Sequence, residues 1–265
     1  MVNLILTGTT GFCGREVLRL ALRSPSVTSI LVITRRPLPD ELGSRKLRTL
    51  IHKDFSDLTP LLSTITSFRP DACIWCLGGP RKVFPTLEEF QKVTVQYPLH
   101  AAQLFSEVCT RDARRLKFVY LSGWGADVTG GRKIWGKGLM GGDGIEMAVK
   151  SHAEKDLFCL SRSAERGIEG ATAGFDLYTF RPGDPPQDGH IASKQAAHCA
   201  GMKGKLKSWI QPTCPNEVLA AAMVGVAMKG FGEQGVSVFF ENREILVVGR
   251  EWVGKLAAGL GPRGM

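Results

Sequence analysis

Three glycines with the spacing of a phosphate-binding turn lie near the N-terminus, in the segment Thr7-Gly8-Thr9-Thr10-Gly11-Phe12-Cys13-Gly14. The first glycine permits a tight turn, the second lets the backbone approach a diphosphate, and the third lets a helix pack closely on a strand. The segment follows an apolar run and precedes an amphipathic one, so unbonded N–H groups at the helix start would face the phosphates. A plain glycine-rich turn is the alternative. We predict that a dinucleotide contacts Gly8, Thr9, Thr10, Gly11, Phe12 and Gly14.

Two arginines follow the second predicted strand, residues 29–34, where an NAD-binding domain usually carries an acid for the ribose 2′-hydroxyl. Arg35 and Arg36 offer guanidinium groups, which pair bidentately with phosphate, so the pattern favours the 2′-phosphate of NADP. Two solvated surface arginines are the alternative. Asp54, just past the third predicted strand, is expected either to accept a hydrogen bond from the adenine amine or to cap the following turn.

A serine and a lysine stand where chemistry on a bound substrate would take place. Ser122 follows the fifth predicted strand, and Lys150 lies in the next helical segment. A serine hydroxyl at a strand end can bond a substrate carbonyl, and a lysine there can bond the nicotinamide ribose and lower the pKa of a nearby acid. The alternatives are a turn serine and a solvated helix lysine.

Short apolar runs alternate with helical segments along most of the chain. Strands are predicted at residues 2–7, 29–34, 47–52, 72–77, 118–121 and 177–180, and helices at 16–23, 86–109 and 145–161. Apolar strands alternating with helices indicate a parallel sheet covered on both faces, with ligands beyond the carboxyl ends of its strands. We therefore predict an α/β fold, a doubly wound parallel sheet of the Rossmann type.

The alternation loosens after Pro182. Residues 184–204 are rich in Pro, Gly and polar residues, and a helix is predicted at 215–229. We predict one domain over residues 1–265, with a dinucleotide-binding core at 1–183. Residues 184–265 would form a small C-terminal cap or substrate region that is not independent.

The composition is that of an ordinary globular chain, with 43% hydrophobic and 22% charged residues. The net charge is +9, but the basic residues are dispersed, so no nucleic-acid partner is expected. No apolar run reaches the roughly 18 residues that span a bilayer, so no membrane partner is expected. The seven cysteines have no framework spacing, which favours reduced thiols and a cytoplasmic location.

A metal site is not predicted either. Cys73 and Cys76 match a C-x-x-C pattern, but residues three apart on a strand point to opposite faces. The five histidines show no ligand spacing with the cysteines.

The chain resembles the atypical short-chain dehydrogenase/reductases, and within them the Tat-interacting-protein type. The resemblance rests on the order of several short motifs: the glycine turn, Thr34-Arg35-Arg36, Cys76-Leu77-Gly78-Gly79, Tyr120-Leu121-Ser122-Gly123-Trp124-Gly125-Ala126-Asp127, Val149-Lys150-Ser151-His152-Ala153-Glu154, Phe180-Arg181-Pro182-Gly183 and Glu241-Asn242-Arg243-Glu244-Ile245. It implies that NADPH is bound by the glycine turn, both arginines, Leu77, Gly78 and Lys150, next to a Ser–Tyr–Lys reductase site. We add Pro182 as a further predicted cofactor contact.

One position departs from this family, because Glu146 stands where the family carries its catalytic tyrosine, four residues before the lysine. No tyrosine lies between Ser122 and Lys150. A glutamate starts near pKa ~4.3, and a neighbouring ammonium lowers it further, so Glu146 would be ionised and unable to donate a proton. It would act as a base or simply pair with Lys150.

We therefore expect an NADPH-dependent oxidoreductase that acts on a small carbonyl compound, with Ser122, Lys150 and Glu146 as its catalytic candidates. The missing tyrosine keeps two alternatives open. One is a non-catalytic NADP(H)-binding regulator that binds a protein partner. The chain would associate with such a partner or with a second copy of itself. The other is an isomerase or dehydratase on the same fold.

Overall fold

The computed structural model describes residues 1–39, 43–129, 144–163, 174–183, 213–233, 235 and 237–257. Seven strands are described: β1 (Val2–Thr7), β2 (Val27–Thr34), β3 (Leu47–Ile51), β4 (Ala72–Trp75), β5 (Lys117–Leu121), β6 (Asp176–Arg181) and β7 (Val238–Glu241). The described helices are α1 (Phe12–Arg23), α2 (Leu62–Phe68), α3 (Leu87–Gln91), α4 (Tyr97–Arg111), α5 (Gly144–Ser161), α7 (Asn216–Lys229) and α8 (Asn242–Ala257).

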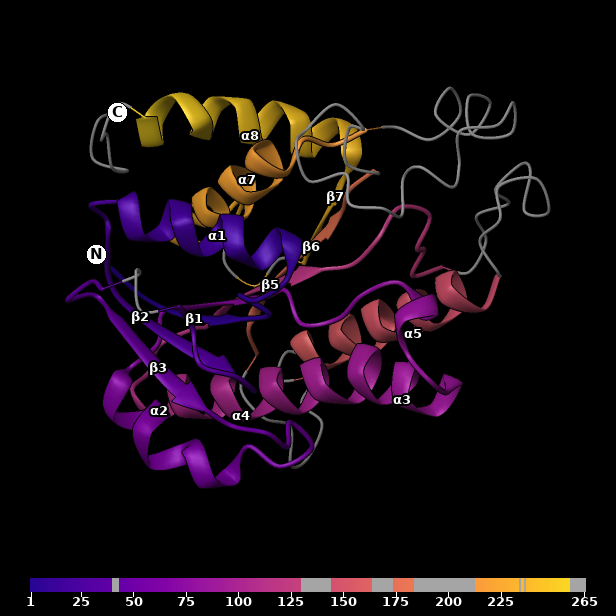
Figure 1. Cartoon of the computed structure of the whole chain (residues 1–265), viewed down its shortest axis with the longest axis horizontal. Helices are drawn as coiled ribbons and strands as arrows, with labels where there is room; N and C mark the ends of the chain where they lie inside the picture. Colours follow the sequence, from indigo (N-terminus) through magenta and orange to yellow (C-terminus); the bar gives the residue numbers. More distant parts are fainter. Residues whose placement is uncertain are drawn as a thin grey trace.

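All seven strands form one parallel sheet in the order β3-β2-β1-β4-β5-β6-β7 (Figure 1). The order reverses between β1 and β4, where Leu6 lies beside Val32 on one side and Ile74 on the other. In such sheets a ligand binds at the carboxyl ends of the strands on both sides of this reversal. The predicted doubly wound Rossmann-type fold is confirmed, and its switch point falls at the glycine turn that follows β1.

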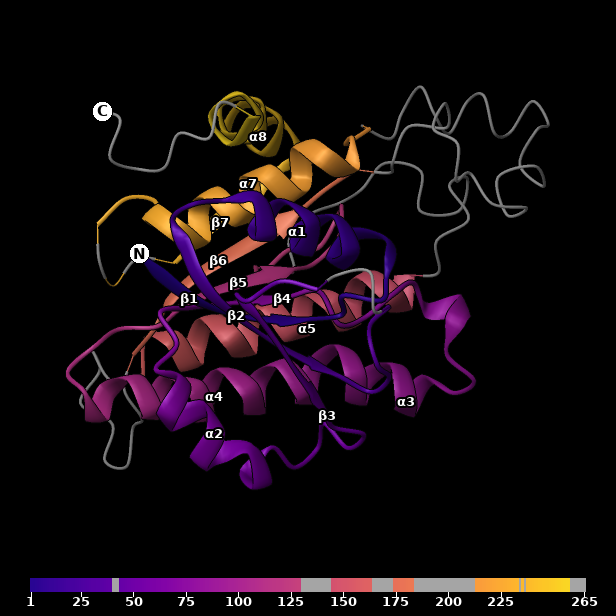
Figure 2. The ribbon, with the colours of Figure 1, turned by 60° about the vertical axis from the view of Figure 1, so that its left-hand side comes forward.

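Helices cover both faces of the sheet (Figure 2). Helices α1, α7 and α8 lie on one face, and α2, α3, α4 and α5 lie on the other. Each face has its own apolar core, and alternate residues of β1 belong to different cores. Leu4 and Leu6 pack into one core, and Ile5 packs into the other. This alternation explains why the buried strands read as unbroken apolar runs.

The single helix predicted at residues 86–109 is interrupted. Helix α3 leads into a π-helical turn at Lys92–Gln96, and α4 begins at Tyr97. Pro98 has no N–H to donate to the carbonyl of Thr94, four residues earlier. The Tyr120 hydroxyl donates to that carbonyl instead, at 3.1 Å. The buried tyrosine of β5 thus satisfies a group that the proline leaves without its helical partner.

The C-terminal region contributes more to the core than the sequence predicted. Helix α7 is buried at every position from Leu219 to Met228, which suits a helix enclosed between other layers. It packs against α1 and α8, and β7 extends the sheet beside β6. Residues 213–257 therefore complete the two-sided sheet, where we expected a cap and loops. The cap itself stays a prediction for residues 184–212, which lie outside the described residues.

Candidate nucleotide-binding and catalytic site

The glycine turn has a backbone shape that only glycine fits at two positions. Gly8 has φ +69°, and a Cβ there would lie 2.3 Å from the carbonyl oxygen of Cys76. A Cβ on Gly14 would lie 2.2 Å from the Gly8 carbonyl oxygen. The backbone of the turn therefore lies against the end of β4 at Gly8 and against helix α1 at Gly14, with no room for a side chain at either place.

The start of helix α1 is prepared for an anion. Gly11 closes the turn by donating its N–H to the Gly8 carbonyl at 2.9 Å. Among the described residues no side chain caps the helix, and its first turn contains no acidic residue. The next amides therefore retain the donors and partial positive charge that bind phosphate groups.

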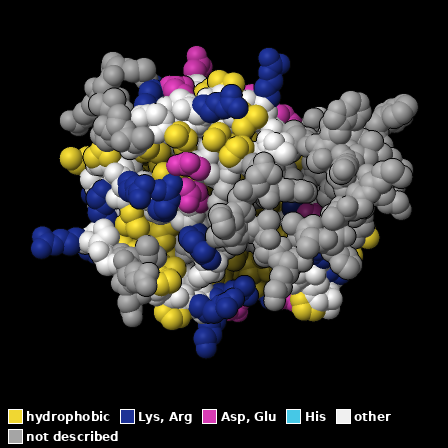
Figure 3. All heavy atoms as spheres, turned by 45° about the horizontal axis from the view of Figure 1, so that its top comes forward, with side chains coloured by type: hydrophobic (Ala, Val, Ile, Leu, Met, Phe, Trp, Pro, Cys, Tyr) yellow, Lys and Arg dark blue, Asp and Glu magenta, His cyan; other side chains and the backbone are white. Residues whose placement is uncertain are grey.

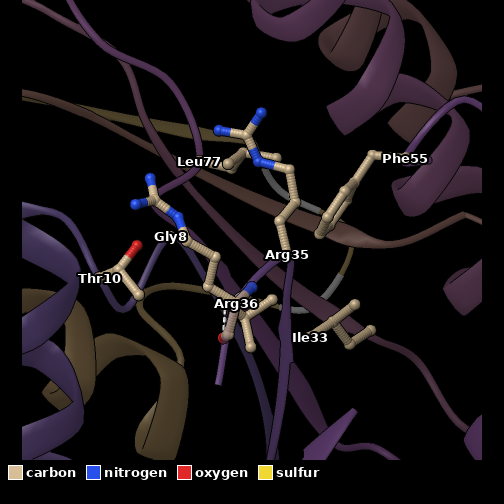
Figure 4. Close-up of a pocket in the computed structure, with 8 residues that line it drawn as sticks. Gly8, Thr10, Ile33, Arg35, Arg36, Phe55 and Leu77 are labelled. Atoms are coloured by element: carbon tan, nitrogen blue, oxygen red, sulfur yellow. Dashed lines mark hydrogen bonds between the residues drawn. The ribbon is translucent and has the colours of Figure 1, made fainter. Parts of the chain in front are cut away.

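A pocket lies between this turn and the ends of β2 and β4 (Figure 4). It is lined by Gly8, Thr10, Ile33, Thr34, Arg35, Arg36, Phe55 and Leu77. Both arginines are exposed, and they reach into the space beside Gly8 and Leu77 (Figure 4). No carboxylate within the described ranges is found within ion-pair distance of either guanidinium group. Within the described ranges, two cations thus face the pocket with no carboxylate paired to them.

Several predicted cofactor contacts do not line the pocket. Thr9 is buried, and its hydroxyl has no hydrogen-bond partner among the described residues. Phe12 is 51% exposed at the helix start. Gly78 follows Leu77 with φ +154°, and Pro182 is half-buried after β6. Their contacts with a cofactor stay predictions.

Asp54 caps the turn that follows it, which is one of the two roles expected for it. Its Oδ1 accepts a hydrogen bond from the Ser56 N–H at 2.9 Å, and this bond holds the pKa of the exposed carboxyl below its usual value. The neighbouring Phe55, rather than Asp54, lines the pocket. Phe55 was not predicted as a site residue; it lies four residues after the end of β3, and only 1% of it is exposed.

The three catalytic candidates come together at the carboxyl end of β5. The Ser122 hydroxyl is buried and has no partner in the described part of the chain. Lys150 on α5 lies over the adjacent Gly123, where an added Cβ would come within 2.7 Å of its Nζ. The Lys150 ammonium donates to Glu146 Oε1 at 2.8 Å, and Glu146 Oε2 accepts the backbone N–H of Arg81 at 3.1 Å.

Glu146 is ionised in this arrangement. Burial raises the pKa of its carboxyl, but the charge and hydrogen bond of Lys150 and the amide of Arg81 outweigh burial and lower it. Glu146 therefore cannot donate a proton near neutral pH, as the residue type predicted. It pairs with Lys150 and fastens the segment after β4 to helix α5.

The Glu146–Lys150 pair predicts a pH-dependent contribution to stability. Because the folded pKa of Glu146 is lowered, the contribution is present above the usual carboxyl pKa of 4.5 and is lost as the pH falls through the folded pKa. We expect Glu146→Gln to lower the melting temperature at neutral pH and to have little effect in strong acid. Glu251→Gln removes an exposed pair with the same spacing, Glu251 with Lys255, and serves as a control that water screens more strongly. A Glu146→Gln effect that is independent of pH would contradict this prediction.

Neither Tyr120 nor Tyr178 replaces the missing tyrosine. The Tyr120 hydroxyl is bonded to Thr94 inside the core, and burial raises the pKa of its phenol. Tyr178 accepts the Phe231 N–H beyond the opposite end of the sheet.

The remaining sequence predictions concern cysteines, metal ligands, membrane spans and basic residues. Cys73 and Cys76 pack into different cores, as their strand spacing predicted. No three His, Cys, Asp or Glu side chains of the described ranges gather as metal ligands. None of the helices within them has the length and apolar character needed to cross a bilayer. On the face in Figure 3 the Lys and Arg side chains are scattered.

Comparisons with known proteins agree with the fold. Residues 4–130 match the model of the NAD dependent epimerase/dehydratase family. Sorbitol-6-phosphate 2-dehydrogenase from Erwinia amylovora has a TM-score of 0.61 and 13% identity, over 91% of this chain and 98% of that one. The Bordetella bronchiseptica enzyme WbmG, solved with NAD and UDP, has a TM-score of 0.60 and 14% identity, over 96% and 78%.

Curated relatives are more similar in sequence. Leucinostatins biosynthesis cluster protein T of Purpureocillium lilacinum is 28% identical over 68% of this chain and 64% of its own length. Protein fmp52, mitochondrial, of Emericella nidulans is 34% identical over 48% of this chain and 53% of its own. The chain thus spans less than two thirds of these two relatives. Protein FMP52, mitochondrial, of Candida albicans is 23% identical over 98% of this chain and its own full length.

One prediction is corrected here. We expected a cytoplasmic location from the cysteine pattern, but three relatives carry the word mitochondrial in their names. The cysteine spacing indicates only that the thiols are reduced. Reduced thiols do not by themselves identify the cytoplasm as the compartment.

At 13% and 14% identity, the two solved structures show the fold of this chain alone. Residues 4–130 are thus similar to the NAD dependent epimerase/dehydratase family, in a chain whose sheet order and glycine turn suit a dinucleotide-binding fold.

Proposed function

We propose that this protein is an NADP(H)-dependent oxidoreductase of the atypical short-chain type that acts on a small carbonyl compound. The observation that carries the proposal is the pair of exposed guanidinium groups, Arg35 and Arg36, beside the glycine turn at the end of β2. A bidentate cation at this place selects for a 2′-phosphate and against a bare 2′-hydroxyl.

The residues present fit such a cofactor. The turn at Gly8 and the uncapped start of α1 would hold the diphosphate, and the two arginines would hold the 2′-phosphate. Leu77 would contact the dinucleotide from the end of β4, and Lys150 would bond the nicotinamide ribose. When bound, the nicotinamide exchanges a hydride with the substrate.

The chain's own groups supply the remaining chemistry. The unpartnered Ser122 hydroxyl would donate a hydrogen bond to the substrate carbonyl oxygen. The Lys150 ammonium lies over Gly123, next to that strand end, and would give a proton to the same oxygen. Ionised Glu146 would hold the ammonium in place.

A second candidate function is favoured by one observation. A carboxylate that stays ionised near neutral pH, as Glu146 does, is suited to abstract a proton from substrate. Residues 4–130 also match a family whose description includes epimerases and dehydratases. In that case the cofactor would return to its starting state in each cycle.

Two measurements on the purified protein test the proposal. Calorimetry with NADPH and NADH is expected to show tighter binding of NADPH. A panel of aldehydes, ketones and quinones with NADPH is expected to show loss of the nicotinamide absorbance for at least one compound. Substrate consumption without net NADPH oxidation would favour the epimerase or dehydratase instead. Tight binding without turnover would favour a non-catalytic regulator, and uptake of neither nucleotide would reject the proposal.

A further inference from the structure

A cluster of three charged side chains lies at the carboxyl end of β6, next to the candidate site. Arg181, the last residue of β6, donates through Nε to both carboxylate oxygens of Glu154, at 3.0 and 3.1 Å, and through its terminal nitrogens to Glu154 and Glu241. Its guanidinium carbon lies 4.8 Å from the centre of the Phe239 ring. The cluster therefore connects α5, β6 and β7.

The two inner members of the cluster are deeply buried. The side chain of Glu154 is 0% exposed, and that of Arg181 is 8% exposed. Burial lowers the pKa of the Arg181 guanidinium, but hydrogen bonds and charges from Glu154 and Glu241 outweigh it, so the group stays charged. Buried ion clusters are often no more stabilising than apolar residues of the same size, but their geometry fixes one arrangement of the elements they join.

The arrangement that this cluster fixes includes the lysine of the candidate site. Glu154 lies four residues after Lys150, so both side chains stand on the same face of α5. Arg181 lies next to the end of β5, because the N–H of Ser122 donates to the carbonyl of Phe180 at 2.9 Å. The distance between the helix and these strand ends determines whether the Lys150 ammonium rests over Gly123.

We propose that Glu154 and Arg181 are positioning residues, which hold helix α5 against the end of β6 so that Lys150 reaches the nicotinamide ribose. Glu241 supports them from β7 as the outer member of the cluster. The inference rests on the proposed function, since it gives Lys150 a ligand to reach.

Two ligands separate positioning from simple stabilisation. NADPH contains the nicotinamide ribose, whereas adenosine 2′,5′-bisphosphate contains only the part that the glycine turn and arginines would hold. We expect Arg181→Lys, which keeps the charge but loses the planar fork, to weaken NADPH roughly 2- to 30-fold and to leave the bisphosphate unchanged. Glu241→Gln tests the same effect with a milder change, because that side chain is 32% exposed.

A double-mutant cycle and a matched control complete the experiment. Lys150→Met alone should weaken NADPH selectively, and Arg181→Lys should add no further loss in that background. Asp176→Asn breaks a pair with Arg115 that is 2.6 Å long and lies at the opposite end of the same strand. It should lower the melting temperature and leave both affinities unchanged.

The outcomes are distinct. Equal weakening of both ligands, no weakening of either, or additive losses with Lys150→Met would overturn the positioning role while the proposed function stood. If the unsubstituted protein bound neither ligand, the proposed function would fall, and the inference with it.

Discussion

Replacement of Arg35 and Arg36 by alanine is expected to weaken NADPH binding roughly 10²- to 10⁴-fold, since each charge-assisted hydrogen bond contributes about 1.5–3 kcal/mol. NADH has a hydroxyl where NADPH has the 2′-phosphate, so its affinity should change little. Both arginines are exposed, and salt screens exposed charges, so the loss should lie at the lower end of this range at physiological ionic strength. Calorimetry at two salt concentrations measures both effects.

A control for overall charge is available in and just before β3. Arg45→Ala with Arg48→Ala removes two positive charges from exposed residues that do not line the pocket. This variant should leave NADPH binding within about twofold of the unsubstituted protein, because salt screens exposed charges that do not touch the ligand. Equal losses of NADPH and NADH in the Arg35 and Arg36 variant would contradict a 2′-phosphate site.

Gly8→Ala is expected to damage both stability and cofactor binding. The backbone at Gly8 lies in the left-handed region at φ +69°, and the new methyl group would meet the Cys76 carbonyl oxygen at 2.3 Å. Strain and overpacking of this kind together cost about 2–5 kcal/mol of unfolding free energy. The melting temperature should fall by roughly 5–15 °C. Because the turn must also shift away from β4, NADPH binding should be lost.

Gly254→Ala is the matched control for this substitution. Gly254 lies inside α8, where an added Cβ meets nothing within 4 Å. Alanine is the better helix former by about 1 kcal/mol, so this variant should be as stable as the unsubstituted protein or more so. Thermal unfolding of both variants measures the contrast. A Gly8→Ala protein that melts normally and binds NADPH at full affinity would show that the turn does not need glycine there.

Local spacing was sufficient for the parts of the site that lie within a few residues of one another. The glycine turn, the two arginines after β2 and the ionised state of Glu146 follow from residue types at fixed offsets along the chain. The parallel sheet also followed, because buried strands and helices that alternate have few other ways to pack. These features depend on contacts short enough to leave a pattern in the sequence.

Contacts between distant residues left no such pattern. Helix α8 and strand β7 were not predicted, and the burial of α7 on all sides depends on α1 and α8, which come from opposite ends of the chain. The bond between Tyr120 and the Thr94 carbonyl needs a proline on one element and a hydroxyl on another. The cluster of Glu154, Arg181 and Glu241 joins three motifs that lie far apart in the sequence, and none of these motifs by itself shows that the side chains meet. Which buried polar groups pair depends on which elements pack together. The local pattern of one segment does not show which distant segment will pack against it.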